Sequence, residues 1–177
     1  MKIIISPAKK MNVDPDTFAA DRMPEFVEDA KILMDAVRSL DYGQAKALWK
    51  CNDKLARLNY ERFKVMDLNR ALTPAVMAYE GLQYLHMAPA VFTKEALSYI
   101  EERLRILSGF YGVLRPFDKV VPYRLEMQAK LEVDSCRDLY QFWGDRLAHQ
   151  LASETDVVLN LASKEYSKAV ETHLPKT

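Results

Sequence analysis

The sequence predicts an α+β fold in which helices surround a small central sheet. Two short apolar runs, Lys2–Ile5 (KIII) and Asp156–Leu161 (DVVLNL), are too short and too apolar for amphipathic helices and are typical of buried strands. Most of the chain between them shows the three-to-four-residue hydrophobic spacing of helices. We therefore expect both runs to be interior strands of one sheet, with the helices packed around it.

Length and charge narrow the possible classes of protein. At 177 residues the chain has the size of one domain, and we expect residues 1–177 to fold as one. Lys and Arg number 25, as do Asp and Glu, so the net charge is zero. This balance argues against indiscriminate binding to polyanions but allows a local basic cleft, because the field depends on charge distribution. No apolar run approaches the roughly 20 residues of a membrane helix.

The residues that carry metal or nucleophile chemistry are scattered. Cys51 and Cys136 lack CxxC spacing, which predicts structural thiols in a reducing cytoplasm. His86, His149 and His173 share no metal-ligand spacing with each other or with the cysteines. There is no GxSxG motif and no glycine-rich nucleotide loop. The sequence therefore predicts no metal site and no cofactor, and it assigns no catalytic residue or reaction.

The segment after each expected strand has the same character. Ser6–Lys10 (SPAKK) follows the first strand, and Ala162–Tyr166 (ASKEY) follows the second. Lysines just after a strand indicate an anion-binding loop at the carboxyl edge of a sheet, although the glycines of a P-loop are absent. The alternative is a solvated pair of lysines. If the strands share a sheet, Lys9 and Lys164 lie at the same edge.

Capping and periodicity predict helices in the first half of the chain over Pro24–Leu40, Asp41–Trp49, and from Asn52 or Asp53 through Phe63. The second and third have the layout of a helix-hairpin-helix module, which binds phosphate with the amides that open its second helix. Lys54 and Arg57 are the candidate contacts there. The turn lacks the usual glycines, so an ordinary helical hairpin remains the alternative.

Further helices are expected over Leu72–Tyr84, Lys94–Leu107 and Arg137–Leu151. The first opens with Thr73-Pro74, a natural cap and first-turn proline, and the second is capped by Thr93.

The stretch Arg103–Met127 (RLRILSGFYGVLRPFDKVVPYRLEM) is the strongest candidate for a binding site. Its two glycines and two prolines predict an irregular loop, and it carries three arginines and two tyrosines: Arg105, Arg115, Arg124, Tyr111 and Tyr123. The planar fork of arginine suits phosphate or carboxylate. The alternative is a packed turn with solvated arginines. We expect Lys9, Arg115 and Arg124 to approach a common cleft.

Several motifs together resemble one family. The runs LRILSGFYGVLRPFD, PYRLEM and LYQFWGD, with IIISPAK, NDKLARLN and VVLNLASKEY, resemble the YaaA family (DUF328/UPF0246) in the same order and over nearly the whole chain. The resemblance implies an unusual mixed α and β fold and a cytoplasmic protein of the peroxide-stress response. It also implies an association with lower free iron and less oxidative DNA damage, and DNA binding through a helix-hairpin-helix element. It implies no secure enzymatic reaction.

The residues and the resemblance together predict non-specific binding of double-stranded DNA through a basic cleft. The candidate phosphate contacts are Lys9, Lys10, Lys54, Arg57, Arg105, Tyr111, Arg115, Tyr123, Arg124 and Lys164. The alternative is an enzyme that acts on a small phosphorylated or nucleotide-like ligand in the same cleft.

The resemblance also implies that family members continue beyond the position that matches Thr177, so this chain is expected to lack their C-terminal part. We therefore expect an exposed strand edge or apolar patch near the C-terminus, prone to pairing with another chain.

Overall fold

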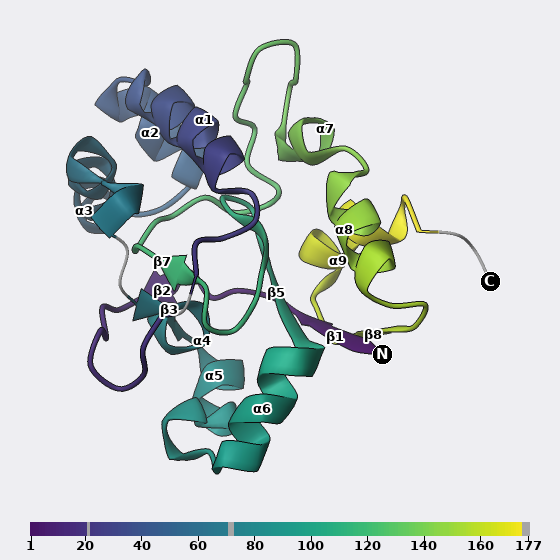
Figure 1. Ribbon diagram of the computed structural model, residues 1–177. Helices are drawn as coiled ribbons and strands as arrows, with labels where there is room; N and C mark the ends of the chain where they lie inside the picture. The colour runs from purple at the N-terminus through teal and green to yellow at the C-terminus, as the bar shows by residue number, and fades with distance from the viewer. Residues whose placement is uncertain (21, 71–72, 175–177) are drawn as a thin grey trace.

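A four-stranded sheet lies at the centre of the computed structural model, which describes residues 1–20, 22–70 and 73–174 (Figure 1). Its strands run in the order β6-β5-β1-β8. The bounds are β1 Lys2–Ile5, β5 Leu104–Ser108, β6 Gly112–Leu114 and β8 Val158–Asn160. Strand β1 pairs in parallel with both β5 and β8, whereas β6 is antiparallel to β5. This architecture confirms the predicted α+β fold.

Helices surround the sheet in three groups (Figure 1). The groups are α1 (Val27–Arg38), α2 (Tyr42–Trp49) and α3 (Asp53–Val65) at the upper left; α4 (Ala75–Ala78), α5 (Leu82–Met87) and α6 (Lys94–Arg103) below; and α7 (Leu139–Trp143), α8 (Arg146–Glu154) and α9 (Lys164–Glu171) at the right. Two 3₁₀ turns and two small antiparallel pairs complete the described elements: η1 (Leu68–Arg70), η2 (Pro89–Val91), β2 (Lys10–Met11) with β4 (Tyr79–Glu80), and β3 (Thr73–Pro74) with β7 (Lys119–Val120).

The first expected strand lies where the sequence predicted. In β1, Ile4 and Ile5 are almost fully buried, and the strand has a neighbour on each side. A parallel strand covered on both faces needs an apolar run instead of an alternating one, which explains the KIII sequence.

The second expected strand is in the same sheet, but the prediction that it is interior is wrong. Strand β8 is the edge strand after β1. Val157, Leu159 and Leu161, in and beside it, are 57%, 42% and 58% exposed. This confirms the expected exposed strand edge near the C-terminus.

Helix α6 ends earlier than predicted. The spacing of Leu97, Ile100, Leu104 and Leu107 fits a helix, but α6 stops at Arg103 and β5 begins at Leu104 without a loop. All five residues of β5 are buried because the strand is paired on both sides and is also packed against by α9. A short apolar run is compatible with the hydrophobic period of a helix and with that of a strand. Here, pairing within the sheet makes it a strand.

Two other predicted helices are interrupted. Residue 72 lies outside the described residues; from Thr73 to Tyr84 the chain forms β3, α4, β4 and the start of α5 in place of one helix. The expected helix Arg137–Leu151 divides into α7 and α8 at Gly144, whose φ of 52° lies in the region that favours glycine.

The helical hairpin of α2 and α3 is capped as predicted. Asp41 forms a full capping box with Gln44 at the start of α2. At the start of α3, the Asn52 side chain accepts a hydrogen bond from the Leu55 amide at 2.9 Å.

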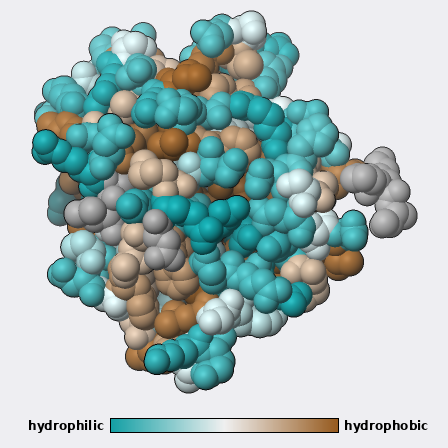
Figure 2. Space-filling model, viewed as in Figure 1, coloured by the Kyte–Doolittle hydropathy of each residue, from teal (hydrophilic) through white to brown (hydrophobic). Residues whose placement is uncertain are grey.

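One surface region is conspicuously apolar. Figure 2 shows hydrophobic residues gathered at the lower left, over the α4 and α5 region. Leu82 and Leu85 of α5 are 76% and 70% exposed.

No helix in the described part of the chain has the length and apolarity needed to cross a bilayer.

Candidate anion-binding cleft at the sheet edge

The carboxyl ends of β1 and β8 meet at one edge of the sheet. The Ser163 amide donates to Ser6 Oγ at 2.8 Å, and Ser6 Oγ donates to Ser163 Oγ at 3.2 Å. Lys9 follows β1, and Lys164 is the first residue of α9, exposed and without an ion pair to any described residue. The two lysine-bearing loops therefore leave the same sheet edge, as the sequence predicted.

The segment that carries Arg124 is held close to the turn after β5. A Cβ at Gly109 would lie 2.5 Å from the carbonyl oxygen of Leu125, so only glycine permits this approach. On its other side, the Gly109 carbonyl accepts a hydrogen bond from Trp143 Nε1 at 3.0 Å. These contacts fix the position of the segment Arg124–Glu126 beside the loop of Lys9.

Lys9 and Arg124 share one carboxylate. Lys9 Nζ lies 3.1 Å from Glu126 Oε2, and Arg124 Nη2 donates to Glu126 Oε1 at 2.9 Å. The Arg124 side chain is only 10% exposed, whereas that of Lys9 is 63% exposed. The three residues line a narrow crevice together with Tyr123 and Tyr166.

A hollow of about 130 Å³ lies beside this cluster. Lys9, Trp49, Lys50, Arg124 and Glu126 line it, and we call these five residues the sheet-edge cleft. A second hollow of about 410 Å³ shares Lys50 with it. The lining has three cations and one anion, and a second acid, Glu165, lies next to it, which leaves a positive excess of one charge when both acids are ionised, in a chain of zero net charge.

Two buried donors in the cleft are unpaired. Trp49 Nε1 and Arg124 Nε are buried and have no acceptor among the described residues. Buried polar groups are normally hydrogen-bonded, so two unpaired donors among the residues of one small hollow are unusual. Sequence reasoning missed both Trp49 and Lys50 as site residues. Their only signal was a position at the C-terminal end of the first helix of the hairpin, which does not show which way they face.

A second carboxyl group borders the cleft. Burial raises the pKa of Glu165, the Gln128 amide that donates to it at 3.3 Å lowers the pKa, and the charges of Glu126 and Lys9 act in opposite directions. The net effect is a raised pKa. Glu165 therefore takes up a proton at milder acidity than an exposed glutamate does.

Arg105 and Arg115 lie away from the sheet-edge cleft. Both line a small crevice together with Asp118 and Glu154. Strand β6 runs antiparallel to β5, so Arg115, just after β6, returns to the edge where β5 begins. Lys9 follows β1 at the opposite edge. The prediction of a common cleft is therefore wrong for Arg115, although it holds for Lys9 and Arg124.

The two predicted tyrosines belong to the core. Tyr111 is 1% exposed, and its hydroxyl accepts from the Val121 amide at 3.3 Å. The Tyr123 hydroxyl is bonded to Ser108 Oγ at 2.6 Å and to the Tyr79 hydroxyl at 2.8 Å. Burial raises the pKa of Tyr123 to about 12. Both hydroxyls are occupied within the fold, which argues against their predicted role as phosphate contacts.

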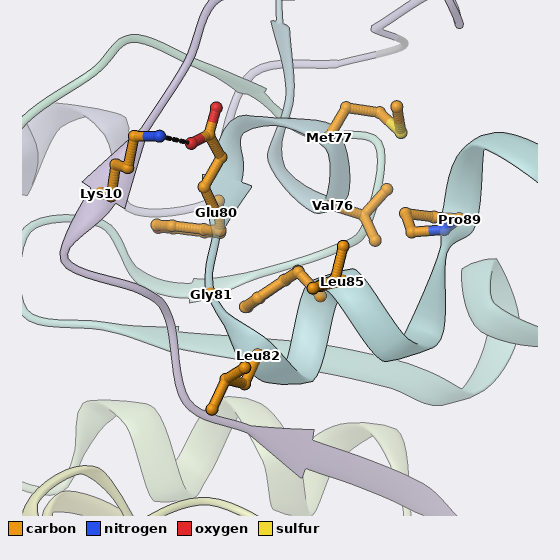
Figure 3. Close-up of a pocket in the computed structure, with 10 residues that line it drawn as sticks. Lys10, Val76, Met77, Glu80, Gly81, Leu82, Leu85 and Pro89 are labelled. Carbon is orange, nitrogen blue, oxygen red and sulfur yellow. Dashed lines mark ion pairs between the residues drawn. The ribbon is translucent and has the colours of Figure 1, made fainter.

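Lys10 faces a different hollow from Lys9. Figure 3 shows it beside an apolar hollow of about 480 Å³, where Val76, Leu85 and Pro89 gather at one end and the Lys10–Glu80 ion pair lies at the other. The pair neutralises Lys10, and the apolar lining offers phosphate no partner. Lys10 therefore does not join the sheet-edge cleft.

The start of α3 is already neutralised within the hairpin. Asp53 accepts from the Tyr42 hydroxyl at 2.6 Å and from Arg57 Nε at 2.8 Å, and Lys46 Nζ lies 3.1 Å away. These hydrogen bonds hold the pKa of Asp53 far below its usual range. Lys54 is exposed and forms no ion pair with a described residue. An anionic side chain where a phosphate would bind favours the ordinary helical hairpin.

Metal ligands are not grouped in this structure. Across residues 1–20, 22–70 and 73–174, no three His, Cys, Asp or Glu side chains are placed to hold a metal ion.

Comparisons with known proteins identify the family. A family model described as peroxide stress protein YaaA matches residues 1–177. A UPF0246 protein of Pediococcus pentosaceus is 57% identical over 174 residues, which cover 98% of this chain and 69% of the relative. UPF0246 proteins of Desulfitobacterium hafniense and Lactiplantibacillus plantarum are 55% and 53% identical, again over 98% of this chain, with 69% and 70% of the relatives covered. The chain belongs to the peroxide stress protein YaaA family.

Proposed function

We propose that this chain acts in the peroxide-stress response by binding duplex DNA non-specifically through the sheet-edge cleft, and so helps limit iron-driven oxidative damage. Its family of peroxide stress proteins supports the oxidative-stress role. The observation that carries the DNA part is the positive excess of the cleft, where Lys9, Lys50 and Arg124 outnumber the acids Glu126 and Glu165.

The chemistry of these groups favours phosphate contacts over base reading. Lysine and arginine contacts to backbone phosphates give affinity without sequence information, and the cleft presents no row of side chains suited to base edges. The zero net charge of the chain keeps the sequence-independent electrostatic contribution to DNA affinity small. We expect a Kd in the micromolar range or weaker near physiological salt.

Anisotropy of two unrelated labelled duplexes, titrated between about 50 and 200 mM salt, tests the proposal. Replacing Lys9 and Arg124 together by Ala should weaken both complexes similarly. The slope of the logarithm of the binding constant against the logarithm of the salt concentration should become about two units less steep. Lys94→Ala, at the start of α6 and far from the cleft, removes one exposed charge as a matched control (Figure 1).

Lys54→Ala with Arg57→Ala tests the rival surface on the helical hairpin. If this pair abolishes binding while the cleft pair has no effect, DNA is held by the hairpin. If neither pair changes the affinity, the DNA proposal is wrong.

A second candidate function is recognition of a small phosphorylated or nucleotide-like ligand in the same cleft. The size of the hollow, about 130 Å³, favours it, because such a space suits a single phosphate group better than a duplex groove. Saturable binding of a mononucleotide, with no steep salt slope and no duplex binding, would select this candidate.

A further inference from the structure

We infer that the free edge of β8 pairs with β8 of a second copy of this chain, in antiparallel orientation about a two-fold axis, so that the two central sheets become continuous. This inference concerns an interaction surface on the far side of β8 from β1. It goes beyond the proposed function and does not depend on it.

Two residues of β8 direct their backbone groups away from the sheet. Strand β1 is bonded to the Val157 carbonyl and to the Leu161 amide, each at 2.9 Å. Because backbone groups alternate between the two sides of a strand, those of Val158 and Asn160 face the free edge. Neither residue forms a backbone hydrogen bond with any described residue. The edge therefore offers two N–H donors and two carbonyl acceptors to another strand.

This edge lacks the features that usually keep exposed strands apart. Exposed edges are commonly protected by a lysine, a proline or a bulge. Residues 157–161 read VVLNL, without a charge or a proline. Val157, Leu159 and Leu161 share one face of the strand and are 57%, 42% and 58% exposed. Unpaired backbone groups beside exposed apolar side chains are the pattern that strand addition uses.

One register satisfies the edge when the partner is a second copy. With Leu159 at the two-fold axis, Val158 lies opposite the partner's Asn160, and the two exchange both backbone hydrogen bonds. Leu159 then lies opposite the partner's Leu159, and Val157 lies opposite the partner's Leu161. All the free backbone groups of the edge are bonded in this register, and the exposed apolar side chains of the two copies pack against each other.

The charges at the two ends of β8 favour the antiparallel orientation. Asp156 precedes the strand and Lys164 follows it, and both are exposed without an ion pair to a described residue. Antiparallel pairing places the start of one strand beside the end of the other, so Asp156 of each copy lies near the end that leads to the partner's Lys164. This complementarity selects a second copy over an arbitrary apolar strand.

The small size of the contact predicts a weak dimer. Strand β8 has three residues, which is far less than the contact of a permanent dimer. We expect a dissociation constant of roughly 10–100 μM. Sedimentation velocity over about 1–300 μM protein should show a mass that rises from 20.4 kDa towards twice that value. A two-fold pair is closed, so assembly should stop at the dimer.

Two variants of β8 test the strand pairing. Leu159→Lys places like charges opposite each other at the axis and should weaken the dimer at least about tenfold. Val158→Pro removes an amide that faces the free edge but leaves the bonds to β1, and should also weaken the dimer about tenfold. Leu82→Lys, on α5, is the matched control, because Leu82 is 76% exposed and lies outside the edge. Circular dichroism checks that each variant is folded.

A cysteine at the axis tests the register. Cys51 and Cys136 are first replaced by Ser. Leu159→Cys should then form a disulfide-linked dimer under mild oxidation, because opposite residues of this kind have Cα atoms about 4.5 Å apart. Val157→Cys should not, because its two copies would lie about 13 Å apart along the strands. Non-reducing electrophoresis measures both.

The outcomes are independent of DNA or anion binding. Weakening by both β8 variants but not by Leu82→Lys, with cross-linking at residue 159, supports the inference. A monomer at every concentration, or assembly beyond the dimer, overturns it. So does a dimer that is lost in Leu82→Lys and kept in Leu159→Lys, since α5 would then be the interface. A dimer sensitive to Leu159→Lys but not to Val158→Pro shows apolar contact without strand pairing and also overturns it.

Discussion

Arg105 and Arg124 come from the same predicted segment, yet their surroundings differ. Arg105 donates from Nε to Glu154 at 2.8 Å and from Nη1 to the Leu104 carbonyl at 2.6 Å. Its side chain is 5% exposed. Arg124 is nearly as buried, at 10%, but it contacts one acid shared with Lys9, and its Nε is unpaired within the described structure.

The difference separates a structural arginine from a candidate binding arginine. Burial alone would raise the pKa of Glu154, but hydrogen bonds from Arg105 and Gln150 and the charge of Arg105 hold it below its usual value. The Arg105 pair is therefore saturated and has little capacity left for a ligand. Arg124 has one hydrogen-bonding partner, Glu126, and lines a hollow large enough for an anion, although its unpaired Nε is itself buried.

The largest expected effect comes from Arg105→Ala. It should lower the free energy of unfolding by about 3–5 kcal/mol, because the nearly buried Arg105 side chain bonds Glu154 and the carbonyls of Glu101 and Leu104, and all of these hydrogen bonds are lost together. Arg124→Ala should cost about 2 kcal/mol or less, since Lys9 still pairs with Glu126. Urea denaturation measures both. Equal losses would contradict the distinction between the two arginines.

Asp118 lines the same crevice as Arg105, and the pH dependence of stability tests how strongly it is buried there. Burial raises its pKa from 3.8 to about 6, although the Arg115 amide, which donates at 2.8 Å, and nearby arginines lower it. The folded state therefore favours the protonated acid, and this contribution to stability is present below about pH 4 and lost as the pH rises to about 6. Asp118→Asn should remove it.

The free energies of unfolding of wild type and Asp118→Asn should diverge by up to about 3 kcal/mol between pH 4 and 6, with the wild type losing stability. Denaturation at each pH checks the difference, and parallel curves would show that Asp118 does not titrate in this range.

Gly109→Ala perturbs the cleft without changing a charge. The added methyl group would lie 2.5 Å from the Leu125 carbonyl, so the segment of Arg124 has to move. We expect a loss of about 1–3 kcal/mol in stability. Anion or duplex affinity should also fall, measured on the folded protein. Gly43→Ala provides a control, since its Cβ would have a milder 3.3 Å contact with an exposed side chain. Unchanged affinity in Gly109→Ala would show that this close approach does not position the cleft.

The smallest expected effect concerns Glu165. Its raised pKa means that the negative charge beside the cleft is lost at mild acidity, which should strengthen anion binding as the pH falls. Glu165→Gln should bind about threefold more tightly at neutral pH and lose this pH dependence, while the Gln128 amide keeps an acceptor. Anion titrations of the wild type and of Glu165→Gln at several pH values measure this difference. A variant with the same profile as the wild type would assign the dependence to another group.

Local signals in the sequence determined part of this protein. The KIII run predicted β1, Asp41 and Asn52 predicted the starts of two helices, and the parallel motifs after the strands predicted a shared edge for Lys9 and Lys164. These features depend on periodicity and hydrogen bonds between residues a few positions apart. The sequence carries that information directly.

Only the tertiary structure decided the rest. Leu104–Ser108 became a strand because β1 and β6 lie on either side of it, and β8 became an edge because no described strand follows it. Arg105 is saturated by Glu154, which lies 49 positions away in the chain. Trp49 joins the cleft only because α2 ends beside the segment of Arg124. Whether a charged or polar group finds a partner depends on which distant segments the fold brings to it, and local patterns do not carry that information.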